Sequence, residues 1–189
     1  MGSVHSSTDR ALRGKEVLGA GDVARSLTRI AFEIIERNGG GEDLVIAGIP
    51  TRGATLAKRL VERIEEVGGP RADLAIIDTT MYRDDLRTQP LRSPEPTHVP
   101  AGGVDGRAVV LVDDVLYTGR TIKAALDALS GIGRASSVQL AVLVDRGHRE
   151  LPIRPDYVGK NLPTSRAETV TILLTETDGR DAVLLGRND

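Results

Sequence analysis

The stretch that decides the fold is VVLVDDVLYTGRT, residues 109–121. It begins with an apolar run that is typical of a strand buried on both faces of a sheet. Asp113 and Asp114 close this run, a short loop follows, and a helical pattern begins at residues 120–121. A buried strand that ends in polar residues and leads into a helix is the usual place for a ligand in an open α/β sheet.

The residue types in this stretch indicate that the ligand is a sugar phosphate. Backbone N–H groups at a helix N-terminus favour an anion, most often a phosphate. Two adjacent carboxylates suit the two hydroxyls of a ribose, or a metal ion bound to them. We therefore interpret residues 109–121 as a ribose-5-phosphate site. The simpler alternative is an acidic strand–turn–helix without a ligand.

Composition excludes several classes of protein. The chain has 189 residues, which fits one domain, and it is 40% hydrophobic and 28% charged, as ordinary globular proteins are. It has no Cys, no apolar run near the ~20 residues of a membrane helix, and no signal peptide, so we expect a cytoplasmic protein without a membrane partner. With aromatic residues at 2%, base stacking cannot dominate any nucleic-acid binding.

The apolar spacing predicts an α/β fold with a mainly parallel, twisted sheet flanked by helices. Helices are expected from Val23 (with Asp22 as N-cap) to about residue 38, and over 54–67 and 121–129. Strands are expected at 44–47, 74–78, 108–113, 138–144, 170–174 and 183–185. Residues 1–189 form a single domain in this interpretation, with a mobile tail at 1–15, a long flexible loop at 81–106 and a small hood at about 146–169.

Residues 109–121 resemble the phosphoribosyl-diphosphate (PRPP) signature of the type I phosphoribosyltransferases. Two further stretches resemble one branch, the pyrimidine-operon attenuator and uracil phosphoribosyltransferase family called PyrR. They are residues 82–85, Tyr-Arg-Asp-Asp, and residues 143–161, which begin Leu-Val-Asp-Arg-Gly-His-Arg-Glu. The resemblance extends over about residues 15–185 and implies the type I phosphoribosyltransferase fold.

The resemblance implies two activities. The first transfers ribose-5-phosphate from PRPP to uracil, giving UMP and diphosphate, with Mg²⁺ held through PRPP by Asp113 and Asp114. The second binds the mRNA leader of pyrimidine genes in response to UMP or UTP, to regulate their expression. The family also implies a homo-oligomer, a dimer or larger.

Family roles fall on matching positions of this chain. The catalytic residues would be Arg83, Asp113 and Asp114, with Arg83 neutralising the departing diphosphate. PRPP would be bound by residues of two loops, Thr51, Arg52, Gly53, Asp113, Asp114, Val115, Leu116, Tyr117, Thr118, Gly119, Arg120 and Thr121. Uracil would be bound by Arg146, Tyr157 and Val158. RNA would be bound by polar residues of the first helix and the hood, Thr28, Arg37, His148, Arg149, Arg154, Lys160 and Thr164.

Tyr117 bears on the choice of base. Purine-using relatives usually carry an Asp at this position, so Tyr117 favours a pyrimidine, but its presence leaves the acceptor of the uracil proton unassigned. Two alternatives remain at this point: a regulator with only residual catalysis, and a salvage enzyme for another base. A dinucleotide-binding dehydrogenase is disfavoured, because no strand is followed by the glycine fingerprint G-x-G-x-x-G.

Overall fold

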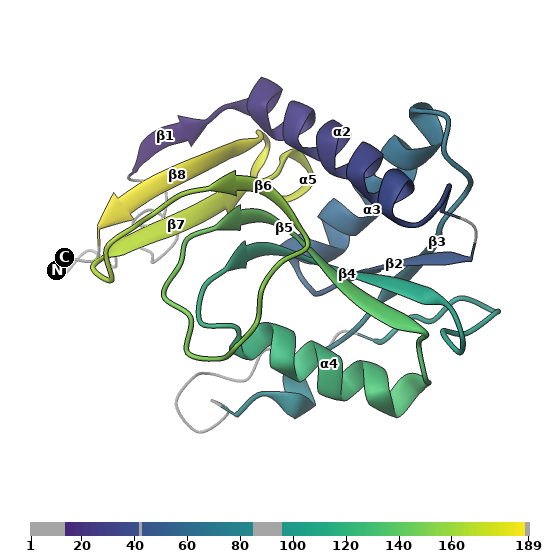
Figure 1. Cartoon of the computed structure of the whole chain (residues 1–189). Coiled ribbons are helices and arrows are strands. Elements are labelled where there is room, and N and C mark those ends of the chain that lie inside the picture. Colours follow the sequence, from purple (N-terminus) through teal and green to yellow (C-terminus); the bar gives the residue numbers. More distant parts are fainter. Residues whose placement is uncertain (1–13, 42, 85–95, 188–189) are drawn as a thin grey trace, which may run out of the picture.

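A computed structural model describes residues 14–41, 43–84 and 96–187, and contains two sheets (Figure 1). Its strands are β1 (Lys15–Leu18), β2 (Leu44–Gly48), β3 (Asp73–Ile76), β4 (Ala108–Leu116), β5 (Ser137–Asp145), β6 (Tyr157–Asn161), β7 (Glu168–Leu173) and β8 (Ala182–Arg187). Its helices are α2 (Ala20–Arg37), α3 (Arg52–Glu66), α4 (Arg120–Ile132), the short α5 (Thr175–Asp178) and a 3₁₀ turn, η1 (Thr80–Tyr82).

The main sheet has the strand order β3-β2-β4-β5-β6, and every neighbouring pair is parallel. Side chains of α2 and α3 share one apolar cluster with one face of this sheet, while α4 packs on the other face. The predicted parallel α/β fold is therefore confirmed. None of the helices in the described part of the chain has the length and apolar character that a membrane crossing requires.

Strand β4 lies in the middle of the sheet, and its successive side chains point alternately into the apolar clusters on the two faces of the sheet. Val110 and Val112 belong to the cluster that contains α2 and α3, whereas Val109 and Leu111 belong to the cluster that contains α4. All four side chains are at most 2% exposed. The strand runs three residues beyond its predicted end at Asp113, so the acidic pair lies within its carboxyl end rather than after it.

The ends of the first helix differ slightly from prediction. Helix α2 has Gly19 as its N-cap, and Asp22 occupies the third helical position, where its Oδ2 accepts a hydrogen bond from the Gly19 N–H at 3.1 Å. Asp22 therefore acts as a carboxylate of the first turn and not as the N-cap residue. The predicted end near residue 38 agrees with the structure, where the helix ends at Arg37 and glycines 39–41 all have positive φ.

A second, antiparallel sheet with the order β1-β8-β7 forms the hood, so both ends of the chain contribute to it (Figure 1). This arrangement differs from the expected hood at about 146–169. Residues 157–161 of that range are β6, the fifth strand of the main sheet, and Lys15, expected in the tail, begins β1. Residues 1–13 of the tail and 85–95 of the long loop lie outside the described residues.

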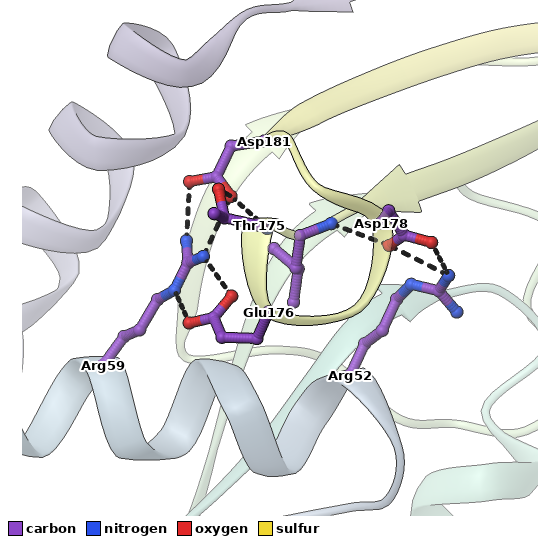
Figure 2. A network of polar contacts seen from close by, with 7 residues as sticks. Arg52, Arg59, Thr175, Glu176, Asp178 and Asp181 are labelled. Carbon is purple, nitrogen blue, oxygen red and sulfur yellow. Dashed lines mark hydrogen bonds and ion pairs between the residues drawn. The ribbon is translucent and has the colours of Figure 1, made fainter.

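The hood is fastened to the main domain through α3. Arg59 donates four hydrogen bonds to two carboxylates at the tip of the hood, those of Glu176 and Asp181 (Figure 2). The Arg59 guanidinium and hydrogen bonds from Thr175 lower the pKa of Asp181 to about 2, and Arg59 also lowers the pKa of Glu176. The side chains of Arg59 and Asp181 are 19% and 15% exposed, so solvent screens this pair less than it screens Glu176, which is 48% exposed.

We expect Arg59→Gln to lower the free energy of unfolding at pH 7 by about 2 kcal/mol, since it removes charged hydrogen bonds to both carboxylates. Because the pKa of folded Asp181 lies below that of the unfolded chain, this contribution is complete above pH ~4 and is lost as the pH falls towards ~2. Urea unfolding at pH 7 and pH 3 measures both effects. Arg63→Gln, on the same helix beside Glu66, is the control and should change little; equal losses in both variants would contradict this account of the hood.

Candidate active site

The site lies where the main sheet changes direction. From β2 the chain passes to α3 and then β3 on one side, whereas from β4 it passes to α4 and then β5 on the other. Because β2 and β4 are neighbours and their helices cover opposite faces, the loops that follow them diverge from one edge of the sheet. Such a switch point leaves a crevice at the carboxyl ends of the strands, which is where open α/β sheets bind ligands.

The two predicted acids occupy this crevice. Asp113 is 7% exposed, and its Oδ1 accepts a hydrogen bond from the N–H of Asp114 at 2.9 Å. The Asp114 Oδ1 in turn accepts from the N–H of Val115 at 2.8 Å. Burial first, and then the charge of Asp114, raise the pKa of Asp113 well above its usual range, while the charge of Arg83 opposes this. The surroundings of Asp113 therefore disfavour its ionised form.

Beside the acids, a cleft of about 360 Å³ surrounds the start of α4. Its lining combines Arg83 and Asp113 with residues 115–122 and Glu150. Gly119 precedes α4 with a φ of 92°, and the N–H of Lys123 makes the bond to the Gly119 carbonyl that begins the helix. The N–H groups of residues 120–122 thus precede the helical ladder, as in an anion-binding helix terminus.

The loop after β5 fixes the shape of this cradle. The carbonyl of Thr118 accepts hydrogen bonds from the N–H groups of Glu150 and Leu151, at 3.0 and 3.2 Å. Arg149 donates to the carbonyl of Tyr117 at 2.9 Å and to Asp145 at 2.6 Å. These bonds engage the carbonyls of Tyr117 and Thr118 in the β4–α4 turn, while the N–H of Arg120 donates to the Thr118 hydroxyl at 3.4 Å.

Arg120 contributes to the cradle by its backbone only. Its guanidinium is committed to two carboxylates, donating to Glu150 at 2.8 Å and to Asp84 at 2.6 Å. The Arg120 side chain therefore joins the start of the long loop to the loop after β5. Sequence reasoning missed Glu150, because an exposed acid in a charged run gives no signal until its partner across the cleft is known.

The loop after β2 touches the acidic pair directly. A Cβ on Gly53 would lie 2.5 Å from the Val112 carbonyl oxygen and 3.2 Å from the Asp113 Cα, so only glycine fits there. Ile49 also donates its N–H to the Val112 carbonyl at 3.0 Å. The peptide bond between Pro50 and Thr51 is cis, a feature that sequence could not reveal.

The side chain of Arg52 does not point into this crevice as predicted for a diphosphate ligand. Its Nη2 donates to both carboxylate oxygens of Asp178, on the hood, at 3.0 and 3.2 Å (Figure 2). The Arg52 Nε is buried and has no hydrogen-bond partner in the described chain. The predicted diphosphate loop is in place, but its arginine connects it to the hood.

At the other end of the cleft, Arg146 and Tyr117 form a stack. The Arg146 guanidinium carbon lies 4.1 Å from the centre of the Tyr117 ring, and the ring of His148 meets that ring edge-on at 5.8 Å. Arg146 also donates to the hood, to the Thr164 hydroxyl at 3.2 Å and to the carbonyls of Ser165 and Glu168 at 3.2 and 2.7 Å. Arg146 is 7% exposed, and its contacts connect Tyr117 to residues 164–168.

The structure does not place Tyr157 and Val158 with the other predicted uracil residues. Tyr157 pairs with Ala141, four residues before the end of β5, which places it roughly 13 Å below the crevice. Its hydroxyl donates to Gln139 at 2.6 Å inside the core, and the Val158 carbonyl accepts from Arg29 at 3.1 Å. The prediction was wrong because residues 157–161 were read as part of the hood instead of as a strand.

The residues predicted to bind RNA fall into two groups. Thr28 and Arg37 lie on α2, which packs against the edge strand β6 that carries Lys160, and Arg154 is exposed shortly before that strand. His148, Arg149 and Thr164 lie instead beside the cleft, where His148 Nε2 is 2.6 Å from the Thr164 carbonyl. Only the first group forms an exposed face, although Arg37 is also paired with Asp156 at 2.8 Å.

Comparison with known proteins agrees with this geometry. The family model described as a phosphoribosyl transferase domain matches residues 14–172. The bifunctional protein PyrR of Streptomyces coelicolor is 60% identical over 178 residues, covering 94% of this chain and 92% of the relative. The bifunctional protein PyrR of Mycolicibacterium paratuberculosis is 53% identical over 190 residues and covers 98% of each chain.

Solved structures show the same fold at low sequence identity. The hypoxanthine phosphoribosyltransferase of Trypanosoma cruzi is similar with a TM-score of 0.70 and 18% identity, covering 93% of this chain and 97% of that one. A hypoxanthine phosphoribosyltransferase of Staphylococcus aureus has a TM-score of 0.67 and 20% identity, covering 100% and 98%. At this identity the likeness concerns the fold alone.

We expect Asp113→Asn to stabilise the ligand-free protein while abolishing measurable PRPP binding. Because the folded pKa of Asp113 lies above the unfolded one, ionising this group destabilises the fold as the pH rises from ~4 through the folded pKa, and asparagine removes that effect. The stability difference between variant and wild type should therefore grow with pH. Thermal unfolding from pH 5 to 8 and calorimetric titration with PRPP measure the two effects; a variant that is less stable at pH 8 would contradict the raised pKa.

Proposed function

The chain belongs to the PyrR family of phosphoribosyltransferases, and we propose how its residues carry out that family's two activities. It is a uracil phosphoribosyltransferase and a regulator of pyrimidine genes. The observation that carries this function is the acidic pair Asp113–Asp114, of which Asp113 is buried, beside a helix N-terminus at the switch point of the sheet, in a chain 60% identical to a bifunctional protein PyrR.

Three neighbouring parts of the crevice would hold PRPP. The 5′-phosphate fits the turn of residues 117–121, where N–H groups precede α4 and the hydroxyls of Thr118 and Thr121 border the cleft. The ribose hydroxyls would donate to Asp113 and Asp114. The diphosphate would then lie between the backbone of the loop at 48–53 and Arg83, since Gly53 touches Asp113 and Arg83 lines the same cleft.

Catalysis follows from the charges in this arrangement. Breaking the bond between ribose C1 and diphosphate leaves positive charge on the sugar, which the nearby carboxylates of Asp113 and Asp114 stabilise. The positive charge of Arg83 would neutralise part of the negative charge on the departing diphosphate. The hood would exclude water, which otherwise competes with uracil for the sugar. The uracil nitrogen then bonds to C1, and its proton leaves to an acceptor that the structure does not identify.

The donors in the cleft fit a magnesium ion that arrives with its substrate. In the described residues, no group of three or more acidic, histidine or cysteine side chains could hold a metal by itself. Mg²⁺ commonly binds through one or two carboxylates together with substrate phosphates, which matches Asp113 and Asp114. When bound there, Mg²⁺ would offset the negative charge of the diphosphate.

The base would lie against Tyr117 and beneath hood residues 164–168. Arg146 supports this placement, because it stacks on the Tyr117 ring and bonds to three groups of that hood segment. An apolar ring on one side and hood backbone on the other suit the face and the edge of a small pyrimidine. This segment takes over the role first predicted for Tyr157 and Val158.

RNA would bind along the α2–β6 edge, through Thr28, Arg37, Arg154 and Lys160. Residues 146–156 lead from the nucleotide cleft to this edge, since Arg146 contacts Tyr117 at one end and Asp156 pairs with Arg37 at the other. UMP would occupy the cradle used by PRPP. If UMP favours the RNA-binding form, RNA must tighten UMP binding by the same factor.

We expect the double substitution of Asp113→Asn and Asp114→Asn to lower UMP formation from uracil and PRPP at least ~10³-fold, because the transition state loses both carboxylates. A radiolabelled-uracil assay measures this. Wild-type protein should accept uracil over orotate, guanine and xanthine. Turnover of a purine without turnover of uracil would instead identify a salvage enzyme for another base, and a wild type without any turnover would identify a regulator alone.

We expect Lys160→Gln to weaken binding of the cognate pyrimidine leader RNA and to reduce the slope of log affinity against log salt by ~1, as loss of one phosphate contact does. Gel shifts with and without UMP over a salt series measure both. Lys123→Gln, on α4 across the sheet, is the matched control and should leave affinity unchanged. Equal losses from both substitutions would contradict an RNA site at the α2–β6 edge.

A further inference from the structure

We propose that Arg52 is a positioning residue that couples the hood to the PRPP site through Asp178, instead of a ligand of the diphosphate. The inference rests on the proposed phosphoribosyl transfer, and it assigns a role to a contact on which the proposed function does not depend. Figure 2 shows the arrangement: Arg52 and Arg59 rise from one face of α3, and both reach the turn at α5.

The hood offers Arg52 a fixed acceptor. The Arg52 Nη2 donates hydrogen bonds to both carboxylate oxygens of Asp178, at 3.0 and 3.2 Å. The Oδ2 atom of Asp178 also accepts a hydrogen bond from the Leu174 N–H at 2.9 Å. The Asp178 carboxylate is 18% exposed, and this backbone bond holds it in place before any ligand arrives. The Arg52–Asp178 ion pair is therefore partly buried, and its acceptor is held by the backbone of the hood.

On the other side, the chain at Arg52 has no freedom to move independently of the acidic pair. Arg52 is the first residue of α3, and the next residue, Gly53, lies against the backbone of Val112 and Asp113 with no room for a Cβ. A shift of the hood that moves Arg52 must therefore move the loop where the diphosphate would bind, or the backbone next to Asp113.

The second arginine explains why the contact at Arg52 is special. Arg59 follows Arg52 by two helical turns on the same face and holds Glu176 and Asp181 with four hydrogen bonds. Arg52 makes fewer hydrogen bonds to the hood than Arg59 does, and its Nε lacks a partner in the described chain. Arg52 is nevertheless the arginine that lies next to the proposed PRPP site.

Strand β7 extends the connection to the base. At its start, the carbonyl of Glu168 accepts from Arg146, which stacks on Tyr117. At its end, Leu173 is followed by Leu174, the residue that fixes Asp178. One strand thus joins the base side of the cleft to the diphosphate side, so that closure of the hood over a base would set the position of the loop that binds PRPP.

The test is a double-mutant cycle of Arg52→Gln and Asp178→Asn, with KM for PRPP, KM for uracil and kcat as readouts. We expect each single variant to raise KM for PRPP about tenfold with a smaller change in kcat, and the double variant to be no worse than either. Arg52→Lys should recover part of the loss. Arg63→Gln, on the same helix without a hood contact, should leave all three constants unchanged.

Three results would overturn the inference. If Arg52→Gln raises KM for PRPP while Asp178→Asn does not, or if their effects multiply, Arg52 acts on the diphosphate independently of the hood. Hydrogen exchange in the ligand-free protein gives a readout that needs no turnover: amides of residues 174–179 should exchange faster in both single variants. Unchanged exchange there would also exclude the coupling, whereas a wild type that makes no UMP would count against the proposed function only.

Discussion

The buried carboxyl group of Asp113, next to a second carboxylate, is the constraint around which the site is arranged. Burial and the charge of Asp114 both disfavour its ionised form, and the hydrogen bond from the Asp114 N–H compensates only in part. The folded protein therefore contains an acidic pair whose ionised form a ligand can stabilise. Ribose hydroxyls would donate hydrogen bonds to these carboxylates, and a bound cation would supply positive charge. The close approach of Gly53 and the N–H groups at α4 are arranged around this pair.

The hood shows how a regulator and an enzyme can share one cleft. It is built from both ends of the chain, docked by Arg59 at one end and by Arg146 at the other. Arg146 also begins the loop of residues 146–156. This loop ends at Asp156, which pairs with Arg37 on the edge that we propose binds RNA. A nucleotide that changes the position of Tyr117 or the hood thus acts on groups connected to both surfaces. The nucleotide can change the RNA-binding free energy only by as much as its own binding free energy differs between the two forms of the protein.

The parts of the site carried by one continuous stretch were predictable from sequence. Residues 109–121 contain the buried strand, the acids and the helix start, and the structure places them together as expected. Parts that depend on contacts between distant residues were not. Nothing in the sequence near Arg52 reveals that its partner is Asp178, 126 positions away. Residues 157–161 lack a clear apolar alternation, so β6 was missed, and with it the true location of Tyr157.

The central claim is that PRPP and UMP occupy the same cradle at the start of α4. Equilibrium competition tests it most directly: the apparent affinity for PRPP is measured by calorimetry at increasing concentrations of UMP. We expect purely competitive behaviour, with the apparent dissociation constant for PRPP rising linearly with UMP and no ternary complex. An apparent constant that reaches a plateau at high UMP would show that both ligands bind at once, and would contradict a shared site.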